Sequence, residues 1–249
     1  MSSIPKRDLG VVIGRFGPET LGHIRLFDTS LSLCRRTFII VGSAQERGTL
    51  RNPFPVETRI KLIRETYPEE PESRLAIGGL NDMTNELDIN VDWGRYLKSN
   101  VENKYSKFAS LMIYGNDEFR SKWFAPEDLK GTDEYIIARS TLPISATMVR
   151  GYLTIGDERN WQKCSHELIH YLYKDLRDEL MSVPVYKEIY DQIRRSRVMD
   201  LDTFMKVYRR YEAEDRKKKL ELNQLKKWEK TAFTWDFLWI VTEKSFRER

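Results

Sequence analysis

Residues 14–23 read Gly-Arg-Phe-Gly-Pro-Glu-Thr-Leu-Gly-His and lie between an apolar run, Leu9 to Ile13, and an amphipathic segment. The apolar run predicts a buried parallel strand, and the Gly-Pro pair ends it before a helix can begin. A helix that starts near Gly22 points its first amide N–H groups, and the positive end of its dipole, into the gap left by this loop. The order strand, loop, helix therefore predicts a phosphate-binding site, with Arg15 and His23 beside it.

Two short motifs narrow the kind of phosphate site. The loop contains neither Gly-x-x-x-x-Gly-Lys-[Ser/Thr] nor Gly-x-Gly-x-x-Gly, which excludes a P-loop kinase and a dinucleotide-binding dehydrogenase. Its end, Thr20-Leu21-Gly22-His23, resembles the [His/Thr]-x-Gly-His signature of nucleotidyltransferases. A second stretch, Ile144 to Arg150, matches the Ile-Ser-x-Thr-x-x-Arg motif at the start of a late helix in these enzymes. Ser145 and Thr147 can cap that helix, and Arg150 can make a forked contact with phosphate.

The segments between the motifs resemble one branch, the archaeal-type nicotinamide mononucleotide adenylyltransferases, including forms fused to a Nudix domain. The resemblance runs from about Leu9 to about Leu180 and has its most specific part in the loop and helix after the second strand. The matching segments are Gly42 to Gln45, Thr49 to Phe54, Glu57 to Ile60, Asp88 to Trp93, and Tyr114 to Asp117.

The resemblance implies an α/β, Rossmann-like nucleotidyltransferase fold and transfer of AMP from ATP to nicotinamide mononucleotide. In that reaction the 5′-phosphate attacks the ATP α-phosphorus directly, with Mg²⁺ on the phosphates and no metal held by the protein alone. It implies catalytic roles for Thr20, His23 and Arg150. It implies an ATP site formed by Gly14, Arg15, Phe16, Thr20, Gly22, His23, Gly115, Asn116, Ser145, Thr147 and Arg150, and a mononucleotide site formed by Gln45, Arg51, Asn90 and Trp93.

Other interpretations of the same residues stay open. The archaeal-type enzymes usually have His where this chain has Thr20, and transferases acting on pantetheine phosphate have Thr there. Another adenylyl or cytidylyl transfer, onto pantetheine phosphate or a flavin nucleotide, is therefore the nearer alternative, and a non-catalytic nucleotide sensor the more distant one. Glu19 places a carboxyl beside the loop for which the sequence gives no reason. Trp93 could equally be a packing residue, because aromatic residues at helical spacing usually enter cores.

One further motif has a structural interpretation. His166 to His170 fits His-Glu-x-x-His, but a zinc site of this kind needs a third ligand, and none is in view. We interpret the stretch Trp161 to Leu180 as an ordinary amphipathic helix. Cys34 and Cys164 lie in different predicted elements and have no pairing or metal spacing.

The composition limits the classes of protein to which the chain can belong. The chain has 249 residues, of which 40% are hydrophobic and 32% charged, a net charge of +4 and a mean hydropathy of -0.58. The bases are interleaved with acids, so a nucleic-acid partner is not predicted. With no signal peptide and no apolar run long enough for a membrane span, we predict a cytoplasmic homo-oligomer that binds ATP and mononucleotide.

Alternation of elements predicts a parallel sheet covered by helices on both faces, with ligand at the carboxyl ends of the strands. Strands are expected near Leu9, Thr37, Leu75, Leu111 and Tyr135, and helices near Ile24, Val56, Asp92 and Thr147. Residues 1–183 are predicted to form the nucleotidyltransferase domain. Residues 184–249 are predicted to form a mainly helical extension that ends in a β-prone segment, Phe233 to Val241, without a Nudix box. Its tryptophans, Trp228, Trp235 and Trp239, suggest oligomerisation or partner binding.

Overall fold

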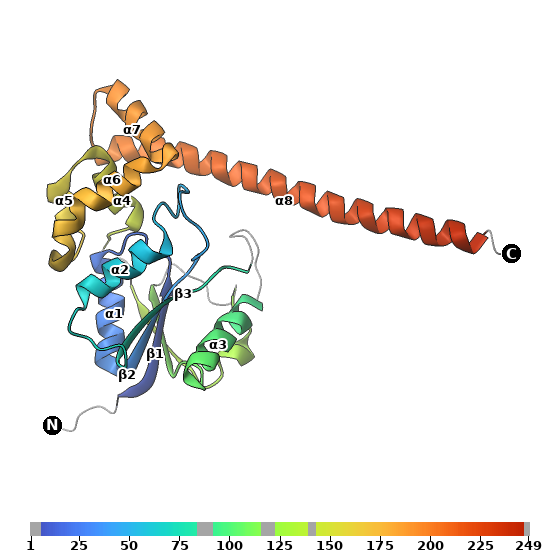
Figure 1. Cartoon of the computed structure of the whole chain (residues 1–249), viewed down its shortest axis with the longest axis horizontal. Coiled ribbons are helices and arrows are strands. Elements are labelled where there is room, and N and C mark those ends of the chain that lie inside the picture. The colour runs from blue at the N-terminus through green and yellow to red at the C-terminus, as the bar shows by residue number, and fades with distance from the viewer. Residues whose placement is uncertain (1–5, 84–91, 116–122, 139–142, 247–249) are drawn as a thin grey trace. The chain divides into compact units, whose positions relative to one another are not determined.

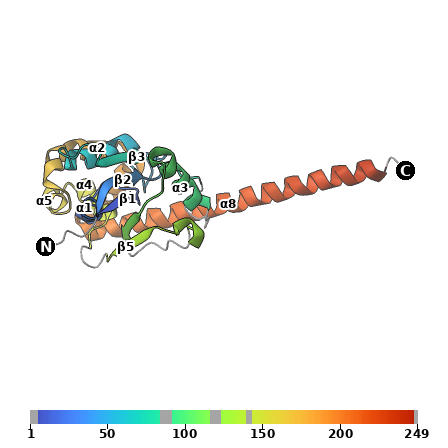
Figure 2. The same ribbon diagram turned by 90° about the horizontal axis from the view of Figure 1, so that it is seen from below.

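The computed structural model describes residues 6–83, 92–115, 123–138 and 143–246, and the side chains of these up to residue 224. At its centre lies a parallel sheet of five strands, which confirms the predicted sheet. The strands are β1 (Arg7–Gly14), β2 (Cys34–Val41), β3 (Leu75–Gly79), β4 (Leu111–Gly115) and β5 (Asp133–Ile137). Their order is β3-β2-β1-β4-β5, and Figure 2 shows β3 and β5 at opposite margins of the sheet.

The winding of the chain reverses next to β1. From β1 the chain proceeds outward through β2 to β3, then returns to pair β4 with the other side of β1, where Gly10 lies opposite both Thr37 and Leu111. In open parallel sheets, ligands bind in the crevice that such a reversal leaves at the carboxyl ends of the strands. The loop after β1, which carries the first motif, begins at this crevice.

Helices cover the two faces of the sheet. The helices α1 (Leu21–Leu33) and α2 (Val56–Thr66) lie on one side and α3 (Asp92–Tyr105) on the other (Figure 1). Because strand side chains alternate, Val12 of β1 packs under α1 while its neighbour Val11 packs under α3, and both are fully buried. Coverage stops at β5, where Tyr135 and Ile136 are 47% and 56% exposed.

The remaining helices lie before and after β5. A 3-10 helix, η2 (Pro126–Leu129), precedes β5; after β5 come α4 (Ala146–Ile155), α5 (Glu158–Gln162), a 3-10 helix η4 (Glu167–Leu172), α6 (Tyr173–Ser182), α7 (Pro184–Ser196) and α8 (Leu201–Phe246). The first turn of α8 packs on α4, because a Cβ at Gly151 would lie 2.6 Å from Leu201 and 2.7 Å from Phe204. The helices near Ile24, Val56, Asp92 and Thr147 are all confirmed.

The chain divides into two compact units, residues 1–205 and 206–249. The first compact unit includes α7, through the fully buried side chains of Tyr186, Ile189 and Ile193. The assignment of separate functions to residues 1–183 and 184–249 stays a prediction. In the part of the chain that the structure describes, no helix combines the length and apolar character needed to cross a membrane.

The second unit is the continuation of α8. Its described side chains are mostly charged, and some pair along the helix, such as Asp215 with Lys219 at 3.0 Å. The helical extension is confirmed, but the β-prone segment predicted for Phe233 to Val241 is wrong, since these residues lie inside α8. β propensity reflects packing against neighbouring strands, whereas a helix satisfies its backbone hydrogen bonds by itself.

Candidate active site

The first motif forms a reciprocal cap at the start of α1. Thr20 Oγ1 accepts a hydrogen bond from the His23 backbone N–H at 3.4 Å, and His23 Nδ1 accepts one from the Thr20 N–H at 3.1 Å. A backbone N–H can only donate, so the proton of the neutral ring belongs on Nε2. The edge of the Phe16 ring meets the His23 ring at 5.1 Å between centroids. His23 therefore presents an N–H donor from a fixed ring beside the end of β1.

We expect Thr20→Val to lower the free energy of unfolding by about 1 kcal/mol, because valine has the shape of threonine but cannot cap the helix. Thr20→Ser keeps the hydroxyl and should recover most of that loss. Denaturant unfolding of both variants and the wild type measures the difference. Equal stability of the valine variant would show that the cap hydrogen bond contributes nothing to the fold.

The second motif contacts the first directly. Ser145 caps α4 by accepting from the Met148 N–H at 3.2 Å, as predicted for a capped helix. Arg150 is buried; its Nη1 donates to the Gly17 carbonyl at 2.7 Å and its Nη2 to Thr147 Oγ1 at 3.1 Å. Residues 133 positions apart thus meet at the loop after β1. The predicted contact of Arg150 with phosphate stays a prediction.

Arg59 of α2, which lies in the matching segment Glu57 to Ile60 but was not predicted as a site residue, joins two of the loops. Its side chain is fully buried, and Nη1 donates to the carbonyls of Arg15 at 3.0 Å and Gly42 at 2.9 Å. Its Nη2 donates to the Ser43 carbonyl at 3.0 Å. Burial lowers the pKa of the guanidinium below its usual range. Arg59 therefore holds the loop after β1 against the loop after β2, at the crevice.

Both loops contain a residue in the left-handed backbone region. Phe16 has φ 46° and Ser43 has φ 50°, conformations that residues other than glycine seldom adopt and that cluster at functional sites. Any larger residue at Gly14, two positions before Phe16, would displace the Phe16 ring, because a Cβ there would lie 2.7 Å from it. These turns aim the chain away from β1 and β2 as soon as each strand ends.

The loops after β2 and β3 are joined through Asp82. Ser43 Oγ donates to Asp82 Oδ2 at 2.5 Å, while the Gln45 side chain pairs with the Asp82 backbone through two hydrogen bonds, of 3.0 and 3.3 Å. Asp82 was not among the residues predicted from the sequence. Gln45, predicted to bind mononucleotide, has its amide already committed to this contact, and it therefore links two loops at the edge of the predicted site.

Comparison with known proteins identifies the family. The family model described as cytidylyltransferase-like matches residues 11–152, more than half of the chain, and this span contains both motifs. The chain belongs to the cytidylyltransferase-like family.

The names of individual relatives agree with the predicted resemblance to nicotinamide mononucleotide adenylyltransferases. The chain is 40% identical over 92 residues to the nicotinamide-nucleotide adenylyltransferase of Saccharolobus solfataricus, and the match covers 36% of this chain and 51% of the relative. Similarity to the enzyme of the same name from Aeropyrum pernix is 34% identity over 90 residues, covering 35% and 50%. The chain spans about half the length of the curated relatives that it matches.

A solved structure has the same fold. It is the bifunctional NMN adenylyltransferase/ADP ribose pyrophosphatase from Francisella tularensis, with a TM-score of 0.55 and 20% sequence identity. The match covers 76% of this chain and 54% of that protein. The Rossmann-like nucleotidyltransferase fold predicted from the motifs is thereby confirmed.

The remaining predicted residues of this cytidylyltransferase-like site are placed as follows. Arg51 is half-buried in the loop after β2, and Gly115 ends β4. Trp93, in the first turn of α3, is half-buried and packs against Trp123 and Phe124, with ring centroids 5.9 and 6.2 Å away. Gly22 lies in the first turn of α1. Asn90 and Asn116 lie outside the described residues.

Glu19 is accommodated in the interior. Its side chain is fully buried near Thr66, and burial raises the pKa of its carboxyl from 4.5 to about 8. The Thr66 hydroxyl donates to the Leu62 carbonyl at 3.1 Å, and neither carboxyl oxygen of Glu19 has a hydrogen-bond partner among the residues described. Burial therefore favours the neutral form of Glu19 beside the phosphate loop.

The histidine pair forms a structural turn. His166 caps η4 by accepting from the Leu168 N–H, and His170 Nε2 lies 3.1 Å from the Gln162 carbonyl. The prediction of one ordinary helix over Trp161 to Leu180 is wrong, because α5 ends at Gln162, His166 caps the 3-10 helix η4, and α6 begins only at Tyr173. Within the described ranges no three His, Cys, Asp or Glu side chains gather as a metal site.

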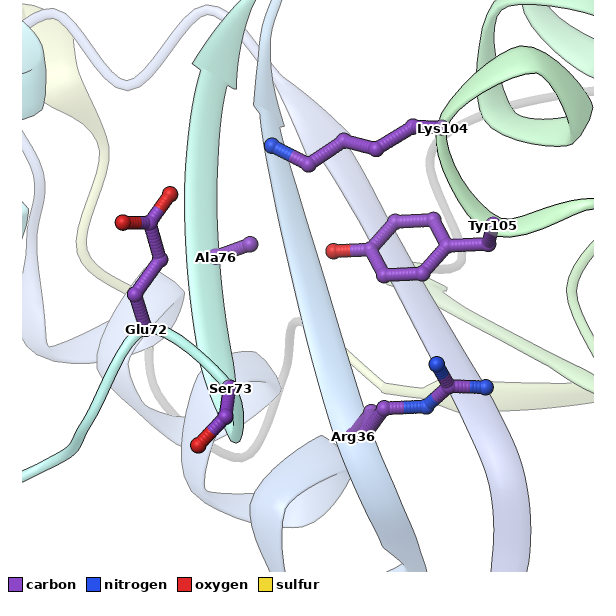
Figure 3. Close-up of a pocket in the computed structure, with 6 residues that line it drawn as sticks. All are labelled: Arg36, Glu72, Ser73, Ala76, Lys104 and Tyr105. Atoms are coloured by element: carbon purple, nitrogen blue, oxygen red, sulfur yellow. The ribbon is translucent and has the colours of Figure 1, made fainter.

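A groove of about 570 Å³ lies at the other end of the sheet (Figure 3). Its lining residues come from the region of the amino ends of β2 and β3 and from the last turn of α3. They are Arg36, Glu72, Ser73, Ala76, Lys104 and Tyr105. The Arg36 guanidinium lies 5.3 Å from the centre of the Tyr105 ring. Because both motifs lie at the carboxyl ends of the strands, this groove is separate from the candidate active site.

Proposed function

We propose that this protein transfers AMP from ATP to nicotinamide mononucleotide, forming NAD and pyrophosphate. The observation that carries the proposal is the meeting of the two motifs: the Thr20–His23 cap and the Arg150 contact with Gly17 converge on the loop that opens the crevice. The names of the relatives support the choice of nicotinamide mononucleotide as acceptor.

The proposed step is a direct displacement. An oxygen of the mononucleotide 5′-phosphate forms a bond to the α-phosphorus of ATP, and the bond from that phosphorus to the bridging oxygen breaks, which releases pyrophosphate. This reaction asks the protein chiefly to position both phosphates and to stabilise the charge on the bridging and leaving oxygens. We assign that stabilisation to His23 Nε2–H, Arg15, Arg150 and the amino end of α1.

Magnesium is proposed as part of the ATP co-substrate. The groups gathered at the loop after β1 are hydrogen-bond donors, namely an imidazole N–H, guanidinium groups and the amino end of a helix. Such donors suit phosphate oxygens, whereas Mg²⁺ prefers carboxylates, carbonyls and water. The ion neutralises phosphate charge when bound, and the protein holds it through the nucleotide.

On the acceptor side we propose that Arg51 binds the mononucleotide phosphate and that Trp93 stacks on the pyridinium ring, with Gln45 and Asn90 beside them. The half-buried Trp93 ring rests on Trp123 and Phe124, which fixes its orientation. A cytoplasmic location and a homo-oligomeric state are proposed with this function.

An acceptor panel tests the proposal. Purified protein is incubated with ATP and Mg²⁺ and one of four acceptors, namely nicotinamide mononucleotide, its deamidated form, pantetheine phosphate or a flavin mononucleotide, and pyrophosphate release is measured. The assignment is supported if pyrophosphate is released only with nicotinamide mononucleotide, or faster with it than with the other acceptors. A preference for another acceptor would replace it with the related transfer, and binding of ATP without release for any acceptor would indicate a sensor.

We expect Trp93→Ala to weaken nicotinamide mononucleotide binding by about 0.5 to 2 kcal/mol, the range of cation–π contacts, with ATP affinity nearly unchanged. Trp93→Phe keeps an aromatic face and should recover part of the loss. Calorimetric titration with each nucleotide measures both. An equal loss for ATP and mononucleotide would show that Trp93 acts only in packing against Trp123 and Phe124.

A further inference from the structure

The loop between β2 and α2 is a compact turn built around Arg51. The Gly48 N–H donates to the Pro53 carbonyl at 3.2 Å, and the Thr49 N–H donates to the Asn52 carbonyl at 3.2 Å. The Asn52 N–H returns a hydrogen bond to Thr49 Oγ1 at 3.0 Å. These contacts close the turn, so that the direction of Arg51 depends on how its two neighbouring peptide groups are held.

Those neighbours are buried while Arg51 is not. Leu50 is 6% exposed and Asn52 is fully buried, with its Nδ2 donating to Glu46 Oε2 at 2.5 Å. Arg51 between them is only half-buried. The loop is therefore anchored on both sides of Arg51, whose side chain stays partly accessible beyond the carboxyl end of β2.

The anchor on the Leu50 side comes from α7. The Tyr186 hydroxyl donates to the Leu50 carbonyl at 2.7 Å, and the Tyr186 side chain is fully buried. This carbonyl belongs to the peptide group that joins Leu50 to Arg51. A hydrogen bond to it limits rotation of that peptide plane, and with it the direction in which Arg51 leaves the backbone.

The helix that carries Tyr186 is itself fixed. Ile189 and Ile193 follow Tyr186 at helical spacing, and all three are fully buried in the first unit. α7 packs on α6 and on α4, the helix from which Arg150 holds the Gly17 carbonyl. A continuous set of contacts thus joins the loop of Arg51 to the loop of the first motif.

We propose that α7 supports the acceptor site from behind and that Tyr186 is a positioning residue, which holds the Leu50–Arg51 peptide so that Arg51 faces the phosphate of the mononucleotide. The proposal rests on the proposed function for the identity of that ligand. Both sequence motifs end before α7. Without the hydrogen bond from Tyr186, this helix would be interpreted only as a connection to the C-terminal extension. In this assignment it sets the acceptor affinity from outside the crevice.

The test is Tyr186→Phe, which removes one hydroxyl and keeps the packing of the ring. We expect the Kd of nicotinamide mononucleotide to rise about 3- to 10-fold, the worth of one hydrogen bond, with KM for the acceptor rising similarly. Turnover at saturating acceptor and the Kd of ATP should stay within about twofold. In an Arg51→Ala background the same substitution should change acceptor affinity by less than about twofold, because its effect passes through Arg51.

A matched control and a second measurement separate the possible failures. Tyr67→Phe removes another tyrosine hydroxyl, one that donates to Asp28 Oδ1 at 2.7 Å, and should leave acceptor affinity unchanged. Hydrogen exchange of the peptide spanning residues 46–54 reports the loop without any ligand, and Tyr186→Phe should accelerate it at least 3-fold while Tyr67→Phe does not. Unchanged exchange overturns the proposal whatever the substrate is. Faster exchange with unchanged acceptor affinity also overturns it, whereas faster exchange in a protein that binds a different phosphorylated acceptor leaves the positioning role and replaces the proposed function.

Discussion

His23→Ala is expected to reduce turnover by about two to three orders of magnitude, the usual effect of removing one hydrogen-bond donor that acts in the transition state. Because Nδ1 accepts the Thr20 N–H, the proton of the neutral ring lies on Nε2, and we propose Nε2–H as the donor to the transferring phosphate. Pyrophosphate release with ATP, Mg²⁺ and nicotinamide mononucleotide measures the loss.

Alanine at position 23 also removes the acceptor of the Thr20 N–H, so part of any loss could come from a weakened cap. His23→Asn separates the two effects, because an amide oxygen can replace Nδ1 but nothing reaches the place of Nε2. We expect the asparagine variant to unfold near the wild-type denaturant concentration and to be about as slow as the alanine variant. Wild-type turnover in either folded variant would remove His23 from the mechanism.

The fold followed from the sequence because its signals are local. A central strand that helices cover on both faces forms an uninterrupted apolar run, as in Val11 and Val12 of β1, whereas the margin strand β5 is exposed. The first motif could be placed for the same reason, since the strand end, the cap and the helix start are adjacent in the chain. The second motif could be placed for the same reason, because Ser145, which caps α4, and Arg150 lie close together in the chain.

The links between the loops could not be predicted. Arg59 and Tyr186 are buried polar residues in amphipathic helices, and from the sequence each has the pattern of a residue at the edge of an apolar face. Their partners, the carbonyls of Gly42 and Leu50, lie 17 and 136 residues away and carry no side-chain signal. Asp82 pairs with Gln45 through backbone atoms, which any residue type could supply.

Glu19 and the end of α8 were misjudged for a related reason. The aromatic and β-prone residue types of Phe233 to Val241 predicted a strand, which only a neighbouring strand could have stabilised. The sequence placed the Glu19 charge beside the phosphates because residue 19 precedes the motif. In the structure the side chain is buried near Thr66, and desolvation favours its neutral form.

The burial of Glu19 predicts that stability falls as pH rises. The carboxyl has a pKa of about 8 in the folded protein against an ordinary value of 4.5, so between these values the unfolded chain has released a proton that the folded protein retains. The free energy of unfolding therefore decreases with pH, by up to about 1.4 kcal/mol per pH unit, because the unfolded state binds fewer protons. Below pH 4.5 both states are protonated, and above pH 8 both are ionised, so the slope is confined to this window.

Glu19→Gln removes the titration and keeps the shape of the side chain. Other groups titrate in the same range, so the informative quantity is the difference in unfolding free energy between the variant and the wild type, measured by denaturant unfolding from pH 5 to pH 8. We expect that difference to move in favour of the variant by roughly 3 to 4 kcal/mol across the range. Glu69→Gln alters an exposed carboxyl just beyond α2 and should run parallel to the wild type. A Glu19→Gln curve that also stays parallel would mean that the Glu19 carboxyl is already ionised in the folded protein, and the phosphate loop would then carry the negative charge that burial is inferred to suppress.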